Sequence, residues 1–324
     1  MQCFPKNLVI NERYQVVSPL GEGAMSAVYL VRDLQRPGAL WALKELKQPQ
    51  GNQEEREMAL ELFRREGSIL ASLNHPGLPR LIDFCGDGQH NYLVMERVKG
   101  NTLDTILGGR VQPLRPEEAI PIALQAAHVI AYLHAQNPPV IFRDLKPSNI
   151  MLTPSGRVRF IDFGIARFFD AKQGKDTQEL GTPGFCAPEQ YSGHSNLSSD
   201  IYSLGVTLYY LLTLKDPQSF NFKFPPLSEI NPDAPPGLDP ILAKCLELDS
   251  SQRCQSASQL AHDLFELLRT MDHAPNASTR SLESALLSLS HHYKYVKSEG
   301  IRESLGFWWS WIKTIWGPLS KRPQ

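Results

Sequence analysis

Two short stretches of the chain carry the residue types that phosphoryl transfer needs. Residues 142–149, Phe-Arg-Asp-Leu-Lys-Pro-Ser-Asn, supply Asp144, Lys146 and Asn149, and an Asp-Phe-Gly triplet adds a second carboxylate at Asp162. Transfer of a phosphoryl group requires an oriented hydroxyl, a metal ion on the phosphate oxygens and fixed positive charge. Asp144 is suited to orient the hydroxyl and accept its proton, and Lys146 to hold the departing phosphoryl group. Asn149 and Asp162 offer the oxygen ligands that Mg²⁺ prefers.

Composition narrows the class of protein. The 324 residues are 42% hydrophobic, which is enough for one large domain or two smaller ones with an appendage. The 33 Lys and Arg against 34 Asp and Glu give a net charge of −1, so no nucleic-acid partner is expected. Five cysteines without a Cys-x-x-Cys pair are typical of a reducing cytosol. Since neither a secretory signal nor a long uncharged apolar run is found, we expect a cytoplasmic protein.

The hydrophobic pattern changes along the chain near residue 100. Before that point, alternating Val- and Tyr-rich runs predict a hairpin over 14–31, strands at 41–44, 81–84 and 92–96, and one amphipathic helix over 54–72. After it, the pattern predicts an extended proline-rich loop over 224–240 and helices at 116–135, 201–214, 238–248 and 257–268. A small β-rich unit followed by a larger helical one is therefore expected.

The motifs occur in the order and at the spacings of eukaryotic-type protein kinases, and the loops most resemble the bacterial serine/threonine branch. The resemblance covers about residues 14–271 and implies the α+β, two-lobed protein-kinase fold. The implied division is a lead (1–13), an N-lobe (14–97), a C-lobe (98–271) and a linker with a Trp-rich tail (272–324). It also implies ATP and Mg²⁺ as cofactors and proteins as substrates. The Arg-Asp-Leu-Lys-Pro-x-Asn form of the loop favours Ser and Thr hydroxyls over Tyr as acceptors.

A glycine-rich stretch, residues 21–26, is the first part of the nucleotide site that the resemblance implies. It keeps two of the family's three glycines, and its members are Gly21, Glu22, Gly23, Ala24, Met25 and Ser26. The stretch also fits a dinucleotide-binding fingerprint, which must lead into a helix. The strand-like run 27–31 follows instead, so a hairpin over the phosphates fits better, with an ordinary hairpin turn as the structural alternative.

Lys44, in Trp-Ala-Leu-Lys, corresponds to the family's lysine that anchors the α and β phosphates. We choose Glu66 as its ion-pair partner, with Glu57 and Glu61 on the same predicted helix as alternatives. The resemblance assigns further nucleotide contacts to Val28, Ala42, Met95, Glu96, Val98 and Leu152. Core packing is the competing interpretation for each apolar member of that set. The implied catalytic residues are Lys44, Glu66, Asp144 and Lys146, and the implied metal ligands are Asn149 and Asp162.

One position of the catalytic loop departs from the family. Phe142 stands where the family has histidine, which puts the rigidity of the loop in question and leaves the chemistry untouched. Arg143, beside the catalytic aspartate, implies binding of a phosphate on the activation segment. Thr177 is the expected phosphoacceptor, with a plain polar loop residue as the alternative. Thr182 is instead expected to contact Asp144 and Lys146.

Three further residues are expected to have structural roles. Ala187-Pro188-Glu189 closes the activation segment, and Glu189 is expected to pair with Arg253. Asp200, at the start of an apolar helix, is expected to cap the backbone of the catalytic loop.

The last part of the chain is rich in tryptophan. Four of the five tryptophans lie between Trp308 and Trp316, and on a helical wheel the large apolar residues of 305–319 form one stripe. Exposing them to water would be costly, because each buried Trp is worth up to ~5 kcal/mol. Residues 301–324 are therefore expected to dock, and the helical lobe, a membrane interface and a partner protein all remain open.

Two other functions compete with an active protein kinase. A pseudokinase scaffold would bind nucleotide without transfer, and the substitutions at Phe142 and Ser26 keep that hypothesis open. A small-molecule kinase of the same fold is the other alternative. The complete segment 181–189, which builds a platform for peptides in the family, argues against it.

Overall fold

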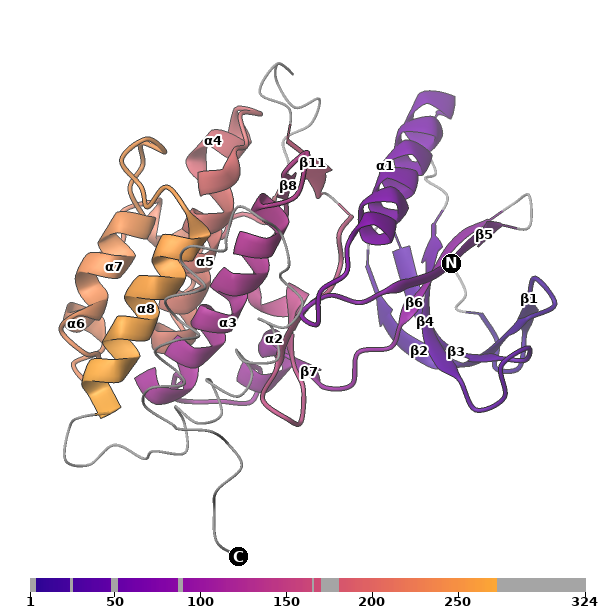
Figure 1. The fold of residues 1–324 in the computed structure, drawn as a ribbon, viewed down its shortest axis with the longest axis horizontal. Coiled ribbons are helices and arrows are strands. Elements are labelled where there is room, and N and C mark those ends of the chain that lie inside the picture. Colours follow the sequence, from indigo (N-terminus) through magenta and orange to yellow (C-terminus); the bar gives the residue numbers. More distant parts are fainter. Residues whose placement is uncertain are drawn as a thin grey trace, which may run out of the picture.

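The chain folds into two lobes in the computed structural model, which describes residues 4–23, 26–47, 52–86, 90–164, 166–169 and 181–272. The strands of one lobe and a single long helix lie at one end of the molecule, and the bundle of helices lies at the other (Figure 1). The division into a β-rich and a helical lobe is confirmed.

The β-rich lobe is built on one antiparallel sheet of six strands, in the order β1-β2-β3-β4-β6-β5. The strands are β1 (Val9–Ile10), β2 (Tyr14–Glu22), β3 (Ser26–Asp33), β4 (Leu40–Leu46), β5 (Leu81–Gly86) and β6 (Asn91–Glu96). Side chains of a strand alternate between its two faces, so Tyr92 and Val94 join one apolar cluster and Leu93 joins another. The lead contributes β1, whose Ile10 is buried beside Tyr14.

Helix α1 (Gln53–Ser72) packs on the face of the sheet that carries Leu93. Its first turn is capped by Asn52, whose side chain accepts a hydrogen bond from the Glu55 amide. Gly67 allows a close approach, because a Cβ there would lie 2.9 Å from Leu93 Cδ2. This approach brings Glu66, the neighbouring residue, into the interior of the lobe.

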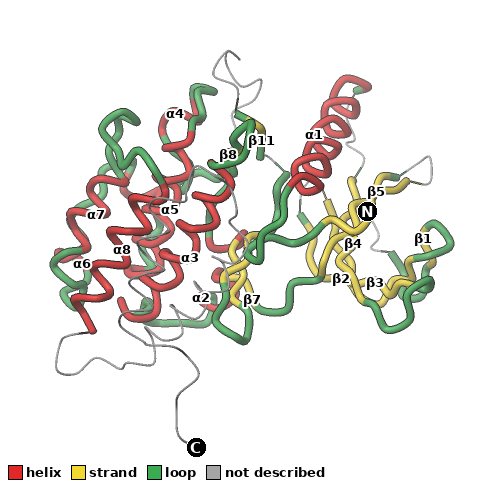
Figure 2. The backbone as a smooth tube through the Cα atoms, viewed as in Figure 1, coloured by secondary structure: helices red, strands yellow, loops and turns green. Residues whose placement is uncertain are grey.

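The helical lobe surrounds α5 (Leu197–Thr213), which is buried over nearly its whole length (Figure 2). The other helices are α2 (Leu103–Leu107), α3 (Pro116–His134), α4 (Pro188–Tyr191), α6 (Leu227–Ile230), α7 (Leu238–Cys245) and α8 (Ala257–Asp272), with 3-10 turns at Pro147–Asn149 and Pro217–Phe220. Helices α3, α5 and α8 supply much of the largest apolar cluster, so the core of this lobe lies between them.

Two predictions were wrong: the start of the helix at residue 201 and the extended loop over 224–240. Helix α5 begins at Leu197, ahead of the predicted residue 201, because its polar first turn is capped by Asn196. The predicted loop 224–240 contains α6, whose Leu227 and Ser228 amides donate to Asp239 Oδ1. The cap of α6 thus comes from a residue outside the helix, which the local pattern does not reveal.

Short strands between the lobes hold the loops that carry the polar motifs. Strand β9 (Ile150–Leu152) pairs with β10 (Val158–Phe160) and β7 (Asn101–Thr102), and β8 (Val140–Ile141) pairs with β11 (Arg167–Phe168). Residues 142–149 therefore run from β8 to β9, and Asp162 follows β10. Within the part of the chain that the structure describes, every helix is too short or too polar to cross a membrane.

Candidate active site

The catalytic-loop backbone is tied to the first turn of α5. Asp200 is fully buried, and its two carboxylate oxygens accept hydrogen bonds from the Phe142 amide (2.9 Å) and the Arg143 amide (2.8 Å). His134, at the end of α3, adds a 2.9 Å contact from its ring Nε2 to Asp200 Oδ2. The predicted cap by Asp200 is confirmed, and His134 is a contributor that the sequence analysis missed.

Asp144 lies at the centre of a polar cluster. The Thr182 hydroxyl donates to Asp144 Oδ1 (2.7 Å), and Asn149 Nδ2 donates to Asp144 Oδ2 (2.8 Å). Lys146 Nζ lies 2.9 Å from Asp144 Oδ2 and donates to Thr182 Oγ1 (2.5 Å). The structure thus brings the expected catalytic carboxylate, cation and amide together with Thr182 of the activation segment.

Lys44 connects the two lobes. Its ammonium lies 2.7 Å from both carboxylate oxygens of Glu66 on α1 and 2.7 Å from Asp162 Oδ1. Burial alone would lower the pKa of Lys44, but the two carboxylates outweigh it and the pKa is raised. Burial raises the pKa of Glu66 in spite of the lysine. Among the candidate partners named from the sequence, the structure places Glu66 beside Lys44.

Asp162 and Asn149 lie close together and offer oxygen atoms to a cation. The Ile161 amide donates to the Asn149 backbone carbonyl (2.9 Å), which puts Asp162 beside the catalytic loop. Desolvation would raise the pKa of Asp162, but the Lys44 ammonium outweighs it and keeps that pKa below its ordinary value. The carboxylate is half exposed (49%), and the Asn149 nitrogen is already bonded to Asp144, which leaves the amide oxygen. Such a hard oxygen set fits Mg²⁺, which keeps several waters.

Within the described part of the chain, Asn149 and Asp162 are not joined by a larger cluster of metal-binding side chains. The described residues contain no group of three or more His, Cys, Asp or Glu side chains that could hold a metal ion. A carboxylate and an amide are sufficient for Mg²⁺ that is bound mainly by phosphate oxygens and water.

The expected nucleotide residues lie on strands of both lobes. In the sheet, Ala42 is paired with Leu30 and Met95, and Lys44 with Val28. Half-buried apolar side chains come from the β-rich lobe, from the connection after β6 and from β9; they are Val28, Met95, Val98 and Leu152. Glu96 Oε2 accepts a hydrogen bond from Arg159 on β10 at 3.0 Å, which joins this connection to the helical lobe.

The glycine-rich stretch ends β2 and begins β3, as the hairpin prediction requires. Gly21 and Glu22 close β2, the Gly23 amide donates to the Ser26 carbonyl (2.8 Å), and Ser26 opens β3. Because a strand follows, the dinucleotide-binding alternative is wrong. Ala24 and Met25 lie outside the described residues.

At position 142, the apolar ring of Phe142 takes the place of the polar histidine ring that the resemblance implies. Phe142 is 1% exposed, and its ring centroid lies 5.0 Å from that of Phe160 and 5.0 Å from that of Phe163 in the Asp-Phe-Gly triplet. Aromatic pairs at this separation stabilise a core beyond the area they bury. The loop is therefore held by packing at this position, and its backbone is held by Asp200.

We expect Phe142→Ala to lower the free energy of unfolding by about 3–5 kcal/mol, because it leaves a cavity between two buried rings. Phe84→Ala is the matched control, since Phe84 is 41% exposed and contacts Phe63 at a larger centroid distance of 6.1 Å. Denaturant unfolding of both variants would measure the difference. Equal losses of unfolding free energy in the two variants would show that the buried packing of Phe142 adds no more stability than a half-exposed aromatic ring.

Arg143 and Arg167 lie on neighbouring segments at the base of the activation segment. Arg167 is buried on β11, where it is paired with Ile141, two residues before Arg143. Its guanidinium lies 3.4 Å from the Ser195 carbonyl. Arg167 was not predicted as a site residue from the sequence. The feature that could have indicated it is a basic residue a few positions after the Asp-Phe-Gly triplet. Thr177, the expected phosphoacceptor, lies outside the described residues.

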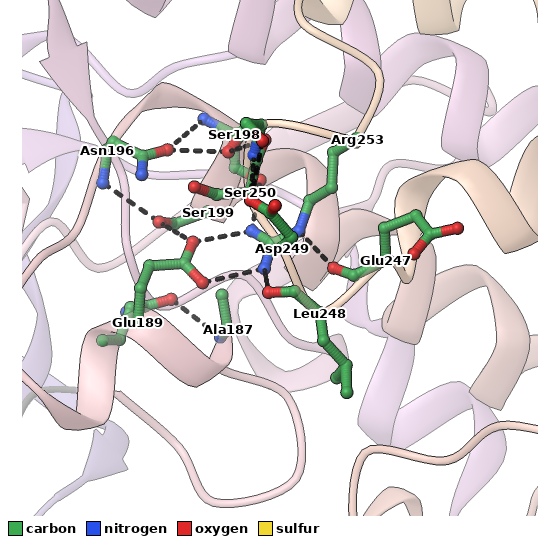
Figure 3. Close-up of polar contacts among 12 residues, drawn as sticks. Ala187, Glu189, Asn196, Ser198, Ser199, Glu247, Leu248, Asp249, Ser250 and Arg253 are labelled. Atoms are coloured by element: carbon green, nitrogen blue, oxygen red, sulfur yellow. Dashed lines mark hydrogen bonds and ion pairs between the residues drawn. The ribbon is translucent and has the colours of Figure 1, made fainter.

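The end of the activation segment is anchored by a buried ion pair (Figure 3). Arg253 Nη1 and Nη2 donate to the two Glu189 oxygens at 2.6 and 2.8 Å, and the Ser199 hydroxyl donates to Glu189 Oε1 (2.6 Å). Arg253 also donates to the backbone carbonyls of Glu247 and Leu248. The predicted pair of Glu189 and Arg253 is confirmed, and its bidentate geometry fixes the segment to the helical lobe.

A β-rich lobe with a lysine–glutamate pair, joined to a helical lobe that carries the Asp144 cluster, is the architecture of the two-lobed phosphotransferases. The family model for the protein kinase domain matches residues 14–265. The chain belongs to the protein kinase domain family.

Similar proteins include curated bacterial serine/threonine kinases. The chain is 35% identical over 288 residues to serine/threonine-protein kinase pkn2 of Myxococcus xanthus, an alignment that spans 80% of this chain and 33% of pkn2. It is 31% identical over 268 residues to PrkC of Bacillus subtilis, covering 79% of this chain and 40% of PrkC. The chain thus spans well under half the length of these two relatives.

A solved structure supports the same fold. The kinase domain of PknI from Mycobacterium tuberculosis, determined as a point mutant, superposes with a TM-score of 0.64 and is 27% identical. The match covers 82% of this chain and 100% of the PknI chain.

Proposed function

We propose that the chain is a serine/threonine protein kinase that transfers the γ-phosphoryl group of ATP to hydroxyl groups of proteins. The observation that carries the proposal is the Asp144 cluster, in which a carboxylate, a cation and an amide meet within hydrogen-bond distance. Asp144 acts as the general base towards the acceptor hydroxyl, and Lys146 stabilises the charge on the transferred group.

The nucleotide is bound by residues from both lobes. Lys44, held by Glu66, contacts the α and β phosphates, and the hairpin 21–26 covers them. The half-buried apolar side chains of Val28, Met95, Val98 and Leu152, with the buried Ala42 and the backbone at Glu96, receive the adenine ring. Asn149 and Asp162 would hold Mg²⁺, which would supply positive charge to the phosphate oxygens.

The acceptor is a Ser or Thr hydroxyl. Lys146 and Thr182 together close one side of the Asp144 carboxylate, and the bidentate Glu189–Arg253 pair holds the segment that follows. A firmly held segment beside the catalytic base supports binding of an extended polypeptide. This arrangement favours protein substrates over small molecules.

Regulation through the activation segment is part of the proposal. Arg143 and Arg167 put two buried guanidinium groups beside the start of the segment, and such groups bind phosphate well. A phosphate on Thr177 would bind these arginines and order the segment.

Location and partners are proposed more broadly. The four described cysteines are not joined in disulfides with one another, which supports a reducing compartment. Residues 301–324 lie outside the described residues, and the proposal for them is peripheral contact with a membrane or a partner protein. Flotation of the full chain with lipid vesicles tests the membrane contact, and a chain that stays with the unbound fraction excludes it.

The test of the proposed function is incubation of the purified chain with labelled ATP and Mg²⁺, with and without a generic protein substrate. We expect label on Ser and Thr, none on Tyr, and autophosphorylation that includes Thr177. Removal of Mg²⁺ by a chelator should abolish incorporation. Nucleotide binding without any incorporation would instead establish a pseudokinase scaffold.

A further inference from the structure

Gln190 connects the activation segment to the catalytic loop. It lies on α4, is 1% exposed, and uses both ends of its amide. Its Nε2 donates to the Arg143 carbonyl (2.9 Å), and its Oε1 accepts from the Ala187 amide (3.0 Å). A glutamine is suited to this position because its side chain offers a donor and an acceptor at the same reach.

Arg143 has a backbone that needs such support. Its φ is +68°, a left-handed conformation that is unfavourable for a residue with a Cβ. The Arg143 amide donates to Asp200 Oδ1 (2.8 Å), and the Arg143 carbonyl accepts from Gln190. The strained residue is therefore held at both ends, once from α5 and once from α4.

The carbonyl of Arg143 belongs to the same planar peptide as the amide of Asp144. The hydrogen bond from Gln190 therefore restrains the peptide unit that joins Arg143 to Asp144. The direction of the Asp144 side chain depends on the orientation of that peptide unit. If this bond is lost, rotation of the peptide would move the carboxylate away from Thr182 and Asn149.

The amide of Gln190 also lies against the activation segment. A Cβ on Gly181 would lie 3.3 Å from Gln190 Nε2, and the next residue, Thr182, is bonded to Asp144. The segment therefore contacts the aspartate directly through Thr182 and indirectly through Gln190.

We propose that Gln190 is a positioning residue, which holds Asp144 in its reactive orientation when residues 181–190 are in this arrangement. The inference rests on the proposed function, because it gives Gln190 a role only if Asp144 is the base. The two hydrogen bonds of Gln190 described above reach the backbones of Arg143 and Ala187, and neither residue is a nucleotide contact or a metal ligand. We therefore expect its replacement to affect the rate of transfer more than nucleotide binding.

Gln190→Met tests the proposal, because methionine keeps the length and volume but can neither donate nor accept these bonds. We expect kcat to fall about 10–100-fold, since displacement of a reacting group by ~1 Å can cost that much. The KM for ATP and the affinity for nucleotide should stay within about twofold of the wild-type values, because Lys44 and Asp162 are untouched.

The matched control is Gln125→Met. Gln125 is 4% exposed, and its amide also makes one donor and one acceptor bond to backbone, with the Gly156 carbonyl (3.1 Å) and the Val158 amide (3.1 Å). These bonds lie on the β9–β10 connection and at the first residue of β10, and neither involves the catalytic loop. We expect a similar loss of melting temperature in both variants, but an unchanged kcat in Gln125→Met.

If Gln190→Met folds poorly, a second variant still tests the proposal. Gln190→Glu keeps the acceptor for the Ala187 amide but places an oxygen against the Arg143 carbonyl, so the same loss of kcat is expected. Unchanged kcat in either folded variant, or a loss matched by Gln125→Met, overturns the proposal. An inactive wild-type chain would instead refute the proposed function, so the two failures are distinguishable.

Discussion

The Asp144→Asn protein is expected to bind nucleotide normally and to transfer phosphoryl groups about 10²–10⁴ times more slowly than the wild type. Asparagine has the shape of aspartate, so the Thr182 hydroxyl keeps an acceptor, but it cannot take a proton from the attacking hydroxyl. The measurement is the initial rate of label transfer at saturating ATP, with nucleotide affinity measured in parallel. Lys44 and Asp162, which bind phosphates and metal in the proposed mechanism, are unchanged in this variant.

Asp233→Asn is the charge-matched control for this experiment. Asp233 is exposed on the loop between α6 and α7, far in sequence from the catalytic loop, and its replacement should leave the rate unchanged. Retention of more than about a tenth of the wild-type rate by Asp144→Asn would remove Asp144 from the role of general base.

Lys44→Met is expected to lower both activity and stability. Loss of the charge that holds the phosphates should reduce transfer about 10²–10³-fold. The Glu66 carboxylate, only 2% exposed, would be left in the interior without its cationic partner. Breaking a buried pair in this way costs about 3–5 kcal/mol of unfolding free energy. Denaturant unfolding and transfer rates measure the two effects separately.

The double variant Lys44→Met with Glu66→Leu separates structure from chemistry. Replacing both charges by apolar side chains is often neutral for stability, so the unfolding free energy should return towards the wild-type value. Transfer should remain lost, because nothing replaces the ammonium. Recovery of activity along with stability would show that Lys44 acts only through the fold.

The pH dependence of Lys44→Met follows from the pKa of Glu66. Burial already raises this pKa, and removal of the lysine raises it further. A carboxyl group with a folded pKa above its unfolded value stabilises the fold at low pH, and this contribution is lost as pH rises through the folded pKa. The variant should therefore be closer to wild type in stability at about pH 5 than at about pH 8. A stability difference between the variant and the wild type that does not change with pH would contradict the ionisation of Glu66 in the variant.

Local patterns were sufficient for the elements whose apolar residues repeat regularly. Helix α1 and the β2–β3 hairpin lie within a few residues of their predicted bounds. One face of each is buried, so its apolar residues recur with the period of a helix or of a strand. The start of α5 was missed although its cap, Asn196, lies next to the helix, because its first turn is polar and breaks the apolar pattern. The whole of α6 was missed because its amides are capped by Asp239, which lies 12 positions from Leu227.

The sequence by itself determined the family, the lobes and the order of the polar motifs. Asp144, Lys146 and Asn149 lie within a few residues of each other, so their cluster is almost a local structure. Residues this close in the chain stay close together in the fold, so a motif of this kind can be recognised from the sequence.

Only the tertiary structure decided those contacts between distant groups that no motif predicts. Glu66 was chosen from the sequence, but Glu57 and Glu61 stayed open until the structure showed that the side of α1 carrying Glu66 and Gly67 faces the sheet. The contact of Gln190 with the Arg143 carbonyl joins segments that are 47 positions apart, and no motif predicted it. Such contacts form because buried polar groups must find partners wherever the packed core places them, and composition or spacing does not record that placement.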